Sequence, residues 1–466
     1  MEIHMDFTGK LWFNDTIRTM RRRDMKRLNQ LPEKKFLRLF FFCFSCSFLV
    51  AAVCMPDRAQ MLTGLWKIVS NPSKGSTNCF DLGGFAATFL NMGLIGLICT
   101  GLYAIPGKKS DSAATLVTIL TTGFGAWGIN IVNMWPTMLG VLLHALLRRE
   151  KVGDHTNQML FSTGLAPFIS ELMVRYPGAE VTGFSLGGVA LAMGVGLVVG
   201  YFLPAGLSNS PIVHKGFDLY SAALPVGMTA FLMQGVLYRA MGVAVPDAVT
   251  SLSVGSPLIT KLFCIILFTT FIVVARLMGC TPKQYWNLLR DPDHVVNFAD
   301  TYDNATMLMN VGVYGLFILL YYSLIGAEFN GVTFGVIFCM LATCNAGSHP
   351  GNVWPIMLGY AVASWVFGLL ATYTGGTFNQ HLNAQAIIVG LCYANGLSPI
   401  ADCYGWRYGM VAAMMHYCMV TTVPELHGSM CLYNGGFTAA LVCLLMVPGL
   451  QRHFKTKRER HELRAK

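Results

Sequence analysis

The chain is a succession of long apolar runs separated by short polar stretches. A helix needs about 20 apolar residues to cross a bilayer, and helices satisfy all their backbone hydrogen bonds internally. We therefore predict a helix for each run. In the first half the runs span residues 37–55, 82–103, 112–126, 131–147, 160–173, 184–203 and 218–239. In the second half they span residues 258–279, 305–325, 331–345, 352–372, 385–400, 409–423 and 431–448.

Composition agrees with this pattern. Hydrophobic residues make up 54% of the chain and charged residues 12%, and the mean hydropathy is +0.52. A soluble domain has about a quarter of its residues charged. We predict an all-α, polytopic integral membrane protein with about fourteen transmembrane or re-entrant helices, because most of the chain must lie where a charge is costly.

The two halves repeat one another. The Asn-Met-Gly sequence at Asn91 returns as Asn-Val-Gly at Asn310, 219 residues later, and the Asn-x-x-Pro-x-x-x-Gly block at Asn133 returns at Asn352 with the same spacing. Further pairs have other spacings, which indicates insertions between matched blocks. These are Leu165-Ala166-Pro167 with Leu397-Ser398-Pro399, and Pro211, His214, Leu219 and Tyr220 with Pro424, His427, Leu432 and Tyr433. We also interpret Asp218 and Asn434 as equivalent helix-opening residues.

Orientation follows from the basic residues, because Lys and Arg concentrate in cytoplasmic loops. We divide the chain into a basic arm at 1–36, a first repeat at 37–250, a second repeat at 251–450 and a basic tail at 451–466. Both ends are then cytoplasmic. Seven crossings per repeat make the repeats inverted, an arrangement in which solute sites form between the repeats. The third and fifth segments of each half are short and interrupted by Gly or Pro. If one such pair fails to cross, the repeats are parallel instead.

Three motifs stand out together. They are the His-x-Gly-x-x-Leu-Tyr pattern at His214 with its second copy at His427, the Phe-Leu-Asn-x-Gly-Leu sequence at 89–94, and the Asn-x-x-Pro-x-x-x-Gly block. As a set they resemble an uncharacterised family of duplicated bacterial membrane proteins, the domain of unknown function 1576. The resemblance covers nearly the whole chain beyond the basic arm and implies no activity. Gly428 follows His427 where Lys215 follows His214, so the sequence alone does not predict a shared role for the two histidines.

Polar residues within apolar runs are the candidates for function, since they are costly in lipid. For a solute site between the repeats we choose Asn91, Asn310, Asp218, Asn434, His214 and His427. Each has a structural alternative: hydrogen bonding between helices for the asparagines, capping for Asp218 and Asn434, and packing for the histidines. Glu171 and Asp402, which follow the matched prolines, are placed at opposite mouths of a pathway or as solvated caps.

The predicted function is a membrane transporter or channel for an unidentified small polar solute. The Leu-Tyr-Asn-Gly-Gly-Phe sequence at 432–437 is loosely similar to the repeats of urea-channel-type proteins, which by analogy implies a pore between repeats. The alternative is a membrane-embedded enzyme or an assembly subunit acting on a lipid or a partner protein. The zinc-protease, phosphate-loop and dinucleotide signatures are absent from the sequence, and we predict no catalytic residues, no metal and no cofactor.

The expected partners are the solute and the lipid bilayer, with anionic lipid at the basic termini. Nucleic acid is not expected, and a homo-oligomer is left open. We place the protein in the bacterial plasma membrane as a multi-pass protein.

Overall fold

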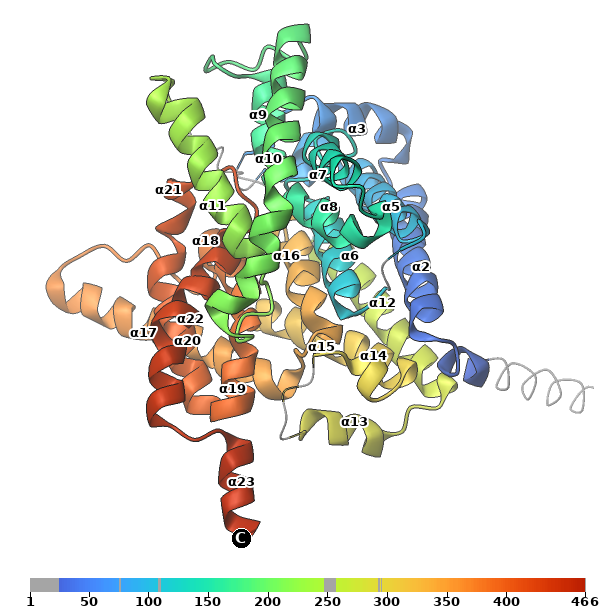
Figure 1. The fold of residues 1–466 in the computed structure, drawn as a ribbon, viewed down its shortest axis with the longest axis vertical. Helices are drawn as coiled ribbons and strands as arrows, with labels where there is room; N and C mark the ends of the chain where they lie inside the picture. The colour runs from blue at the N-terminus through green and yellow to red at the C-terminus, as the bar shows by residue number, and fades with distance from the viewer. Residues whose placement is uncertain are drawn as a thin grey trace, which may run out of the picture.

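The structure is a computed structural model that describes residues 25–74, 77–107, 110–246, 257–291, 294 and 296–465 (Figure 1). Most of the basic arm, Lys108-Lys109 and the predicted boundary between the repeats at 250 lie outside the described residues.

The first half of the described chain is helical wherever a run was predicted. Its helices are α2 (Glu33–Cys54), α3 (Met61–Val69), α4 (Cys79–Gly83), α5 (Phe85–Leu102), α6 (Ser112–Phe124), α7 (Trp135–Leu147), α8 (Thr156–Ser162), α9 (Ala166–Val174), α10 (Leu186–His214) and α11 (Ala223–Gln234). Short turns of other helix types are η1 (Arg58–Gln60), η2 (Val152–His155), η3 (Thr163–Leu165) and η4 (Gly235–Ala240).

The second half has the same order of elements. Its helices are α12 (Pro257–Met278), α13 (Pro282–Leu289), α14 (Phe298–Thr301), α15 (Asn304–Leu324), α16 (Gly331–Leu341), α17 (Pro350–Thr374), α18 (Gln385–Ala394), α19 (Ser398–Tyr404), α20 (Trp406–Val420), α21 (Val423–Leu426), α22 (Asn434–His453) and α23 (Lys457–Ala465), with η5 (Ala342–Asn345) and η6 (Asn395–Leu397).

Among the described residues, eight helical segments are long and apolar enough to cross a membrane. They are Glu33–Cys54, Phe85–Leu102, Leu186–His214, Pro257–Met278, Asn304–Leu324, Pro350–Thr374, Gln385–Tyr404 and Asn434–Leu463. Large apolar side chains on them face outward, such as Phe202, 67% exposed, and Trp365, 66% exposed. Apolar surface of this extent needs lipid or another protein to cover it, and the helices indicate a multi-pass membrane protein.

The molecule has two ends, which we call proximal and distal. The proximal end contains both described termini: Asn29 Oδ1 accepts from the backbone of Ala305 at 2.7 Å, and Lys215 Nζ donates to Gln451 Oε1 at 2.9 Å. At the distal end, Asp57 Oδ1 accepts from Ala86 N at 3.1 Å. In Figure 1, α13, α19 and α23 lie low at the proximal end, and α3 and α9 lie high at the distal end.

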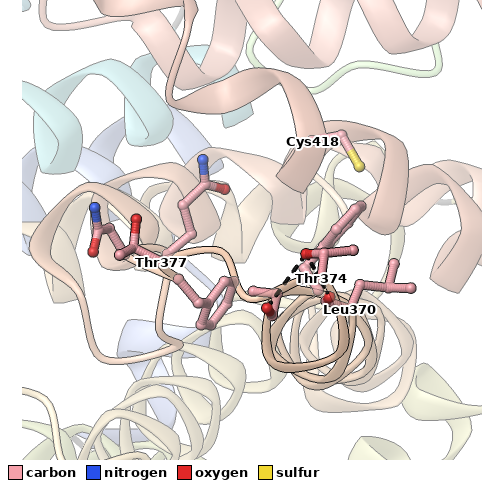
Figure 2. Close-up of a pocket in the computed structure, with 9 residues that line it drawn as sticks. Leu370, Thr374, Thr377 and Cys418 are labelled. Carbon is pink, nitrogen blue, oxygen red and sulfur yellow. Dashed lines mark hydrogen bonds between the residues drawn. The ribbon is translucent and has the colours of Figure 1, made fainter.

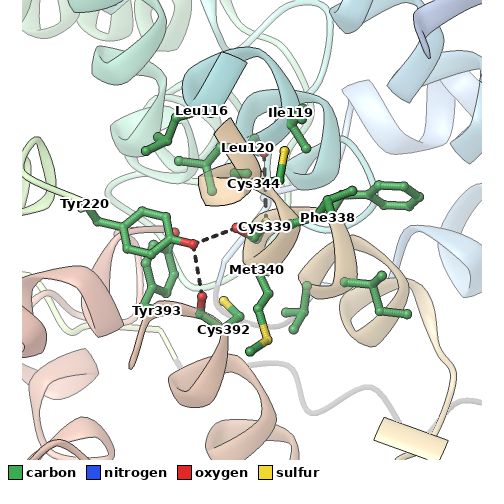
Figure 3. Close-up of a cluster of buried hydrophobic side chains, with 14 of the residues drawn as sticks. Leu116, Ile119, Leu120, Tyr220, Phe338, Cys339, Met340, Cys344, Cys392 and Tyr393 are labelled. Carbon is green, nitrogen blue, oxygen red and sulfur yellow. Dashed lines mark hydrogen bonds between the residues drawn. The ribbon is translucent and has the colours of Figure 1, made fainter. Parts of the chain in front are cut away.

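The centre is built on the crossing of α6 and α16, which occupy equivalent places in the two halves. Gly123 and Gly335 face each other so closely that a Cβ on either would lie within 3 Å of the other's carbonyl oxygen. Further along, Asn345 Nδ2 donates to Thr115 Oγ1 at 3.3 Å. Because the numbering rises on one helix as it falls on the other, the two helices pack antiparallel. Figure 3 shows the apolar cluster on this crossing, with Leu116 and Leu120 beside Cys339.

Candidate functional site

Each half contains a helical hairpin followed by a broken helix. The first hairpin consists of α6, residues 125–134 and α7. It begins and ends at the proximal end, because residue 107 before it lies against Gly153 after it. The second hairpin consists of α16, residues 342–349 and α17. It begins at the distal end and returns there, since Asn330 Nδ2 donates to Gln385 Oε1 at 2.7 Å. The third and fourth predicted segments of each half are therefore the two arms of one hairpin.

The hairpin turns are held by Asn91 and Asn310. The side-chain Nδ2 of Asn91 donates to the carbonyls of Gly125 and Ile129 at 2.7 and 2.8 Å. Asn310 Nδ2 donates to Cys344 and Ser348, the equivalent carbonyls 219 residues later, at 2.7 and 2.9 Å. Both side chains are fully buried. A buried carbonyl without a partner is costly, so these amides satisfy the backbone where the helices stop.

A second pair of asparagines starts the returning arms. Asn133 Oδ1 accepts from Asn130 N at 2.8 Å, and Asn352 Oδ1 accepts from His349 N at 3.0 Å. The geometry gives both asparagines a structural role at the start of a proline-containing helix.

The remaining hydrogen bond of each of these asparagines reaches the broken helix. Asn133 Nδ2 donates to Ser170 Oγ on α9 at 2.9 Å, whereas Asn352 Nδ2 donates to Asp402 Oδ2 on α19 at 2.7 Å. The acceptor on the broken helix is therefore a neutral hydroxyl in the first half and a carboxylate in the second.

The broken helices receive a loop from the other half. The backbone N–H of Leu219 donates to Gly396 O, and that of Leu432 donates to Gly164 O, both at 3.0 Å. The following tyrosines, Tyr220 and Tyr433, pack so closely on these glycines that a Cβ on either glycine would lie under 3 Å from the ring. Each repeat is thus joined to the break in the other.

In both docking loops a ring nitrogen of the histidine contacts the residue that follows the tyrosine, although the nitrogen differs. His214 Nε2 lies 2.8 Å from Ser221 Oγ, and His427 Nδ1 contacts Asn434 Oδ1. The residue after each histidine is left-handed, with φ of +52° at Lys215 and +57° at Gly428. A left-handed φ favours glycine, so the shared conformation accounts for Gly428, whereas Lys215 adopts it at a cost in backbone strain.

The predicted equivalence of Asp218 and Asn434 is wrong. Tyr220 N donates to Asp218 Oδ1 at 2.9 Å, and Tyr433 N contacts Cys431 Sγ at 3.4 Å, so the counterpart of Asp218 is Cys431. Asn434 corresponds to Ser221. The matched tyrosines imply the same register, because the spacing that joins Tyr220 to Tyr433 also places Asp218 opposite Cys431.

The six predicted site residues thus fall in two places. Asn91 and Asn310 lie on the hairpin turns of their own halves, and His214, Asp218, His427 and Asn434 lie in the docking loops. In these loops Asp218 Oδ2 and His427 Nε2 are buried without a hydrogen-bond partner. At the first hairpin turn, Asn91 Oδ1 is likewise buried without a partner.

A polar contact at the proximal end joins Asp402, which the sequence singles out, to His294, which it does not. His294 Nδ1 lies 2.9 Å from Asp402 Oδ2 at the proximal end, and the two side chains are 10% and 11% exposed. His294 lies in the connector between α13 and α14, outside every apolar run. A sequence signal existed: the connector reads Asp-Pro-Asp-His at 291–294, whereas its first-half counterpart reads Asn-Pro-Ser-Lys at 71–74.

At the distal end, α9 contains a buried ion pair. Arg175 Nε donates to Glu171 Oε2 at 2.8 Å, and Arg175 Nη2 donates to Glu171 Oε1. Glu171 is fully buried. Glu171 and Asp402 therefore lie at opposite ends, as the sequence suggests, but each is paired with a side chain and neither is a solvated cap. Among the described residues, no group of three or more His, Cys, Asp or Glu side chains is placed to hold a metal ion.

The docking loops meet at the centre of the molecule. Tyr220 and Tyr393 lie edge to face with ring centroids 4.9 Å apart. Figure 3 shows the Tyr220 hydroxyl between the carbonyls of Cys339 and Cys392, to which it donates at 2.8 and 3.2 Å. The space among Tyr220, Tyr393, Tyr433 and their neighbours does not admit a water molecule. The centre is therefore closed.

A groove of about 530 Å³ opens elsewhere, between the end of α17 and α20. Figure 2 shows Leu370 and Thr374 on α17 facing Cys418, with Thr377 on the following loop. None of the predicted site residues lines it.

Comparison with known proteins identifies the family. The sequence model of the family described as "Protein of unknown function (DUF1576)" matches residues 57–239 and 279–452, which is more than half of the chain. The chain is a member of the DUF1576 family. The two matched segments are the two halves that share hairpin, broken helix and docking loop. No curated protein and no solved structure matches this DUF1576 protein.

Proposed function

We propose that this DUF1576 protein is a transporter or channel that moves a small polar solute across the bacterial plasma membrane, between two inverted repeats. The observation that supports it best is the pair of hairpins and broken helices that meet at the centre. Irregular backbone at membrane depth is tolerated where it is buried in protein or lines a cavity. In transporters built from inverted repeats, interrupted helices of this kind form the solute site.

The proposed topology follows from the directions of the helices. In each repeat one hairpin returns to the end from which it started, so it does not change side. Five other elements connect the two ends; in the first repeat they are α2, α5, α8 with α9, α10, and the docking loop continued by α11 and η4. An odd number of side changes makes the repeats inverted, with both termini on the same side. The arms α6 and α7, of 13 residues each, are about 20 Å long, which is less than the roughly 30 Å hydrocarbon core. In the second hairpin α16 is also short, with 11 residues, whereas α17 has 25 and is long enough to cross; its return to the distal end is inferred from the start of the hairpin there.

The charges favour a cytoplasmic proximal end. Basic residues there include Lys34, Lys35, Arg148, Arg149, Lys215, Arg276, Lys283, Arg290, Arg407, Arg452, Lys455 and Lys457. The distal end has fewer, among them Arg58, Lys67, Arg175, Arg239 and Lys261.

The solute path is proposed to run through the closed centre, past Tyr220 and Tyr433. Because these rings come from docking loops of opposite repeats, moving one repeat relative to the other separates them. The starts of α11 and α22 lie beside the tyrosines, and the first N–H groups of a helix have no partner within the helix; the movement would expose them. Such groups suit a polar solute with hydrogen-bond acceptors.

Flux in proteoliposomes tests this function. We measure the swelling of proteoliposomes in urea and glycerol and their uptake of labelled amino acids. The proteins compared are the wild type, the double variant Tyr220→Ala with Tyr433→Ala, and the control Tyr373→Ala, whose side chain is 91% exposed. We expect the double variant to change flux of at least one probe and Tyr373→Ala to behave as wild type. If folded wild type and folded double variant both match empty liposomes for every probe, the proposal fails.

A further inference from the structure

We propose that His294 and Asp402 form a proton-binding site, and that this site couples proton movement to the solute movement proposed above. The coupling rests on the proposed function, whereas the proton site itself does not. The pair joins the connector before α14 to the broken helix at α19, at the proximal end of the second repeat.

The geometry leaves one nitrogen free to accept a proton. His294 Nδ1 faces Asp402 Oδ2 at 2.9 Å, so Nδ1 is the protonated nitrogen and donates to the carboxylate. His294 Nε2 is buried and has no hydrogen-bond partner. A proton from water at the proximal end binds at Nε2, and the resulting imidazolium is stabilised by the adjacent carboxylate.

The site reaches the hairpin turn through one side chain. The oxygen that faces His294, Asp402 Oδ2, also accepts from Asn352 Nδ2 at 2.7 Å. The same nitrogen donates to Gly347 O at 2.8 Å within the turn. When the imidazole gains a proton, its bond to this shared oxygen strengthens at the expense of the bond from Asn352. The protonation state therefore biases the turn of the second hairpin.

The first repeat has the same backbone without the titratable groups. Ser170 occupies the position equivalent to Asp402, where it accepts a hydrogen bond from Asn133 Nδ2 and carries no charge. Asn130 stands at the place of His349, which caps α17 by accepting from Gly351 N at 3.1 Å. A proton site in one repeat alone gives the two ends of the molecule different responses to pH.

Charged and titratable groups from every neighbouring element surround the pair. They are Asp291 in the same connector, Tyr302 after α14, whose hydroxyl donates to Asp291, His349 at the start of α17, and Lys457 on α23. Asp291 favours a proton nearby, while Lys457 opposes it. Of these groups, the Asp402 carboxylate is the one in direct contact with the imidazole, at 2.9 Å.

Proton uptake by the purified protein tests the site without any solute. An indicator dye reports the protons bound between pH 8 and pH 5. We expect Asp402→Asn to bind about one proton fewer than wild type, because a buried imidazole without its carboxylate stays neutral. An ordinary aspartate titrates near 3.9, so removing one elsewhere changes nothing in this range. The matched control is Ser170→Ala, the equivalent position in the first repeat, which should equal wild type.

The site is overturned if folded Asp402→Asn takes up as many protons as wild type. If that variant does not fold, proton uptake by His294→Gln equal to wild type overturns it.

Coupling is tested in proteoliposomes with the same solutes and an imposed pH gradient. Wild-type flux should rise with the gradient, and flux through Asp402→Asn should be insensitive to it. Flux that ignores the gradient in wild type rejects the coupling and leaves the proposed function standing. If Asp402→Asn binds about one proton fewer, as expected, but wild type shows no solute flux at all, the proton site stands and the proposed transport is rejected.

Discussion

The broken helices of the two repeats share a backbone and differ in charge. In both, an asparagine of the hairpin turn donates to the second half of the broken helix, but it meets Ser170 in the first repeat and Asp402 in the second. The next residue is Glu171, paired with Arg175, in the first repeat and Cys403 in the second. The asparagines that bond to the backbone are present in both repeats, whereas the residues they meet on the broken helices differ in charge. The positions that hold the fold are therefore distinct from those that differ chemically between the repeats.

The largest effect should come from the charge of the first repeat. Arg175→Met leaves the fully buried Glu171 without its partner, and we expect a loss of about 3–5 kcal/mol in the free energy of unfolding. Asp402→Asn in the second repeat keeps both hydrogen bonds of the side-chain oxygen and should lose about 1 kcal/mol. Unfolding by SDS in mixed micelles measures both. The control is Arg148→Met, whose pair with Glu150 is exposed and whose loss should not move the transition. Equal losses for Arg175→Met and Arg148→Met would contradict a buried ion pair.

Both copies of the shared scaffold should respond, the second slightly more strongly because Asn310 Oδ1 also accepts from the Tyr285 hydroxyl at 3.1 Å. Asn91→Leu and Asn310→Leu each leave two buried carbonyls without a donor, and we expect each variant to lose about 2–3 kcal/mol. Asn209→Leu, at an exposed asparagine on α10, should stay within about 0.5 kcal/mol of wild type. Thermal melting of the detergent-purified variants gives the order. A large loss confined to one repeat would show that the two hairpin turns are not equivalent.

The smallest effect should separate the two central tyrosines. Tyr220 donates to two backbone carbonyls, while the Tyr433 hydroxyl is buried without a partner. Tyr220→Phe should therefore lose about 1 kcal/mol. Tyr433→Phe should be neutral or stabilising, because it removes an unsatisfied polar group. Thermal melting of both variants tests this. A greater loss of stability for Tyr433→Phe than for Tyr220→Phe would contradict the assignment of the hydrogen-bonded hydroxyl to Tyr220.

The helices and the duplication could be predicted from the sequence because each depends on local or repeated signals. Apolar runs fixed the positions of α2, α5 and α15 to within a few residues, and the shared spacing of Asn91 with Asn310 is reproduced in their hydrogen bonds. The pairing of Asp218 with Asn434 failed because one helix opening was compared with another by residue type alone.

The sequence by itself determined that this chain is a duplicated, helical membrane protein, because lipid admits only helices or closed barrels and long continuous apolar runs select helices. Only the tertiary structure decided which asparagines hold the hairpin turns, that the loops of each repeat dock on the broken helix of the other, and that His294 meets Asp402. These contacts join residues far apart in the chain, and the hydrogen-bond partners of a buried polar group are fixed by packing rather than by the residues beside it.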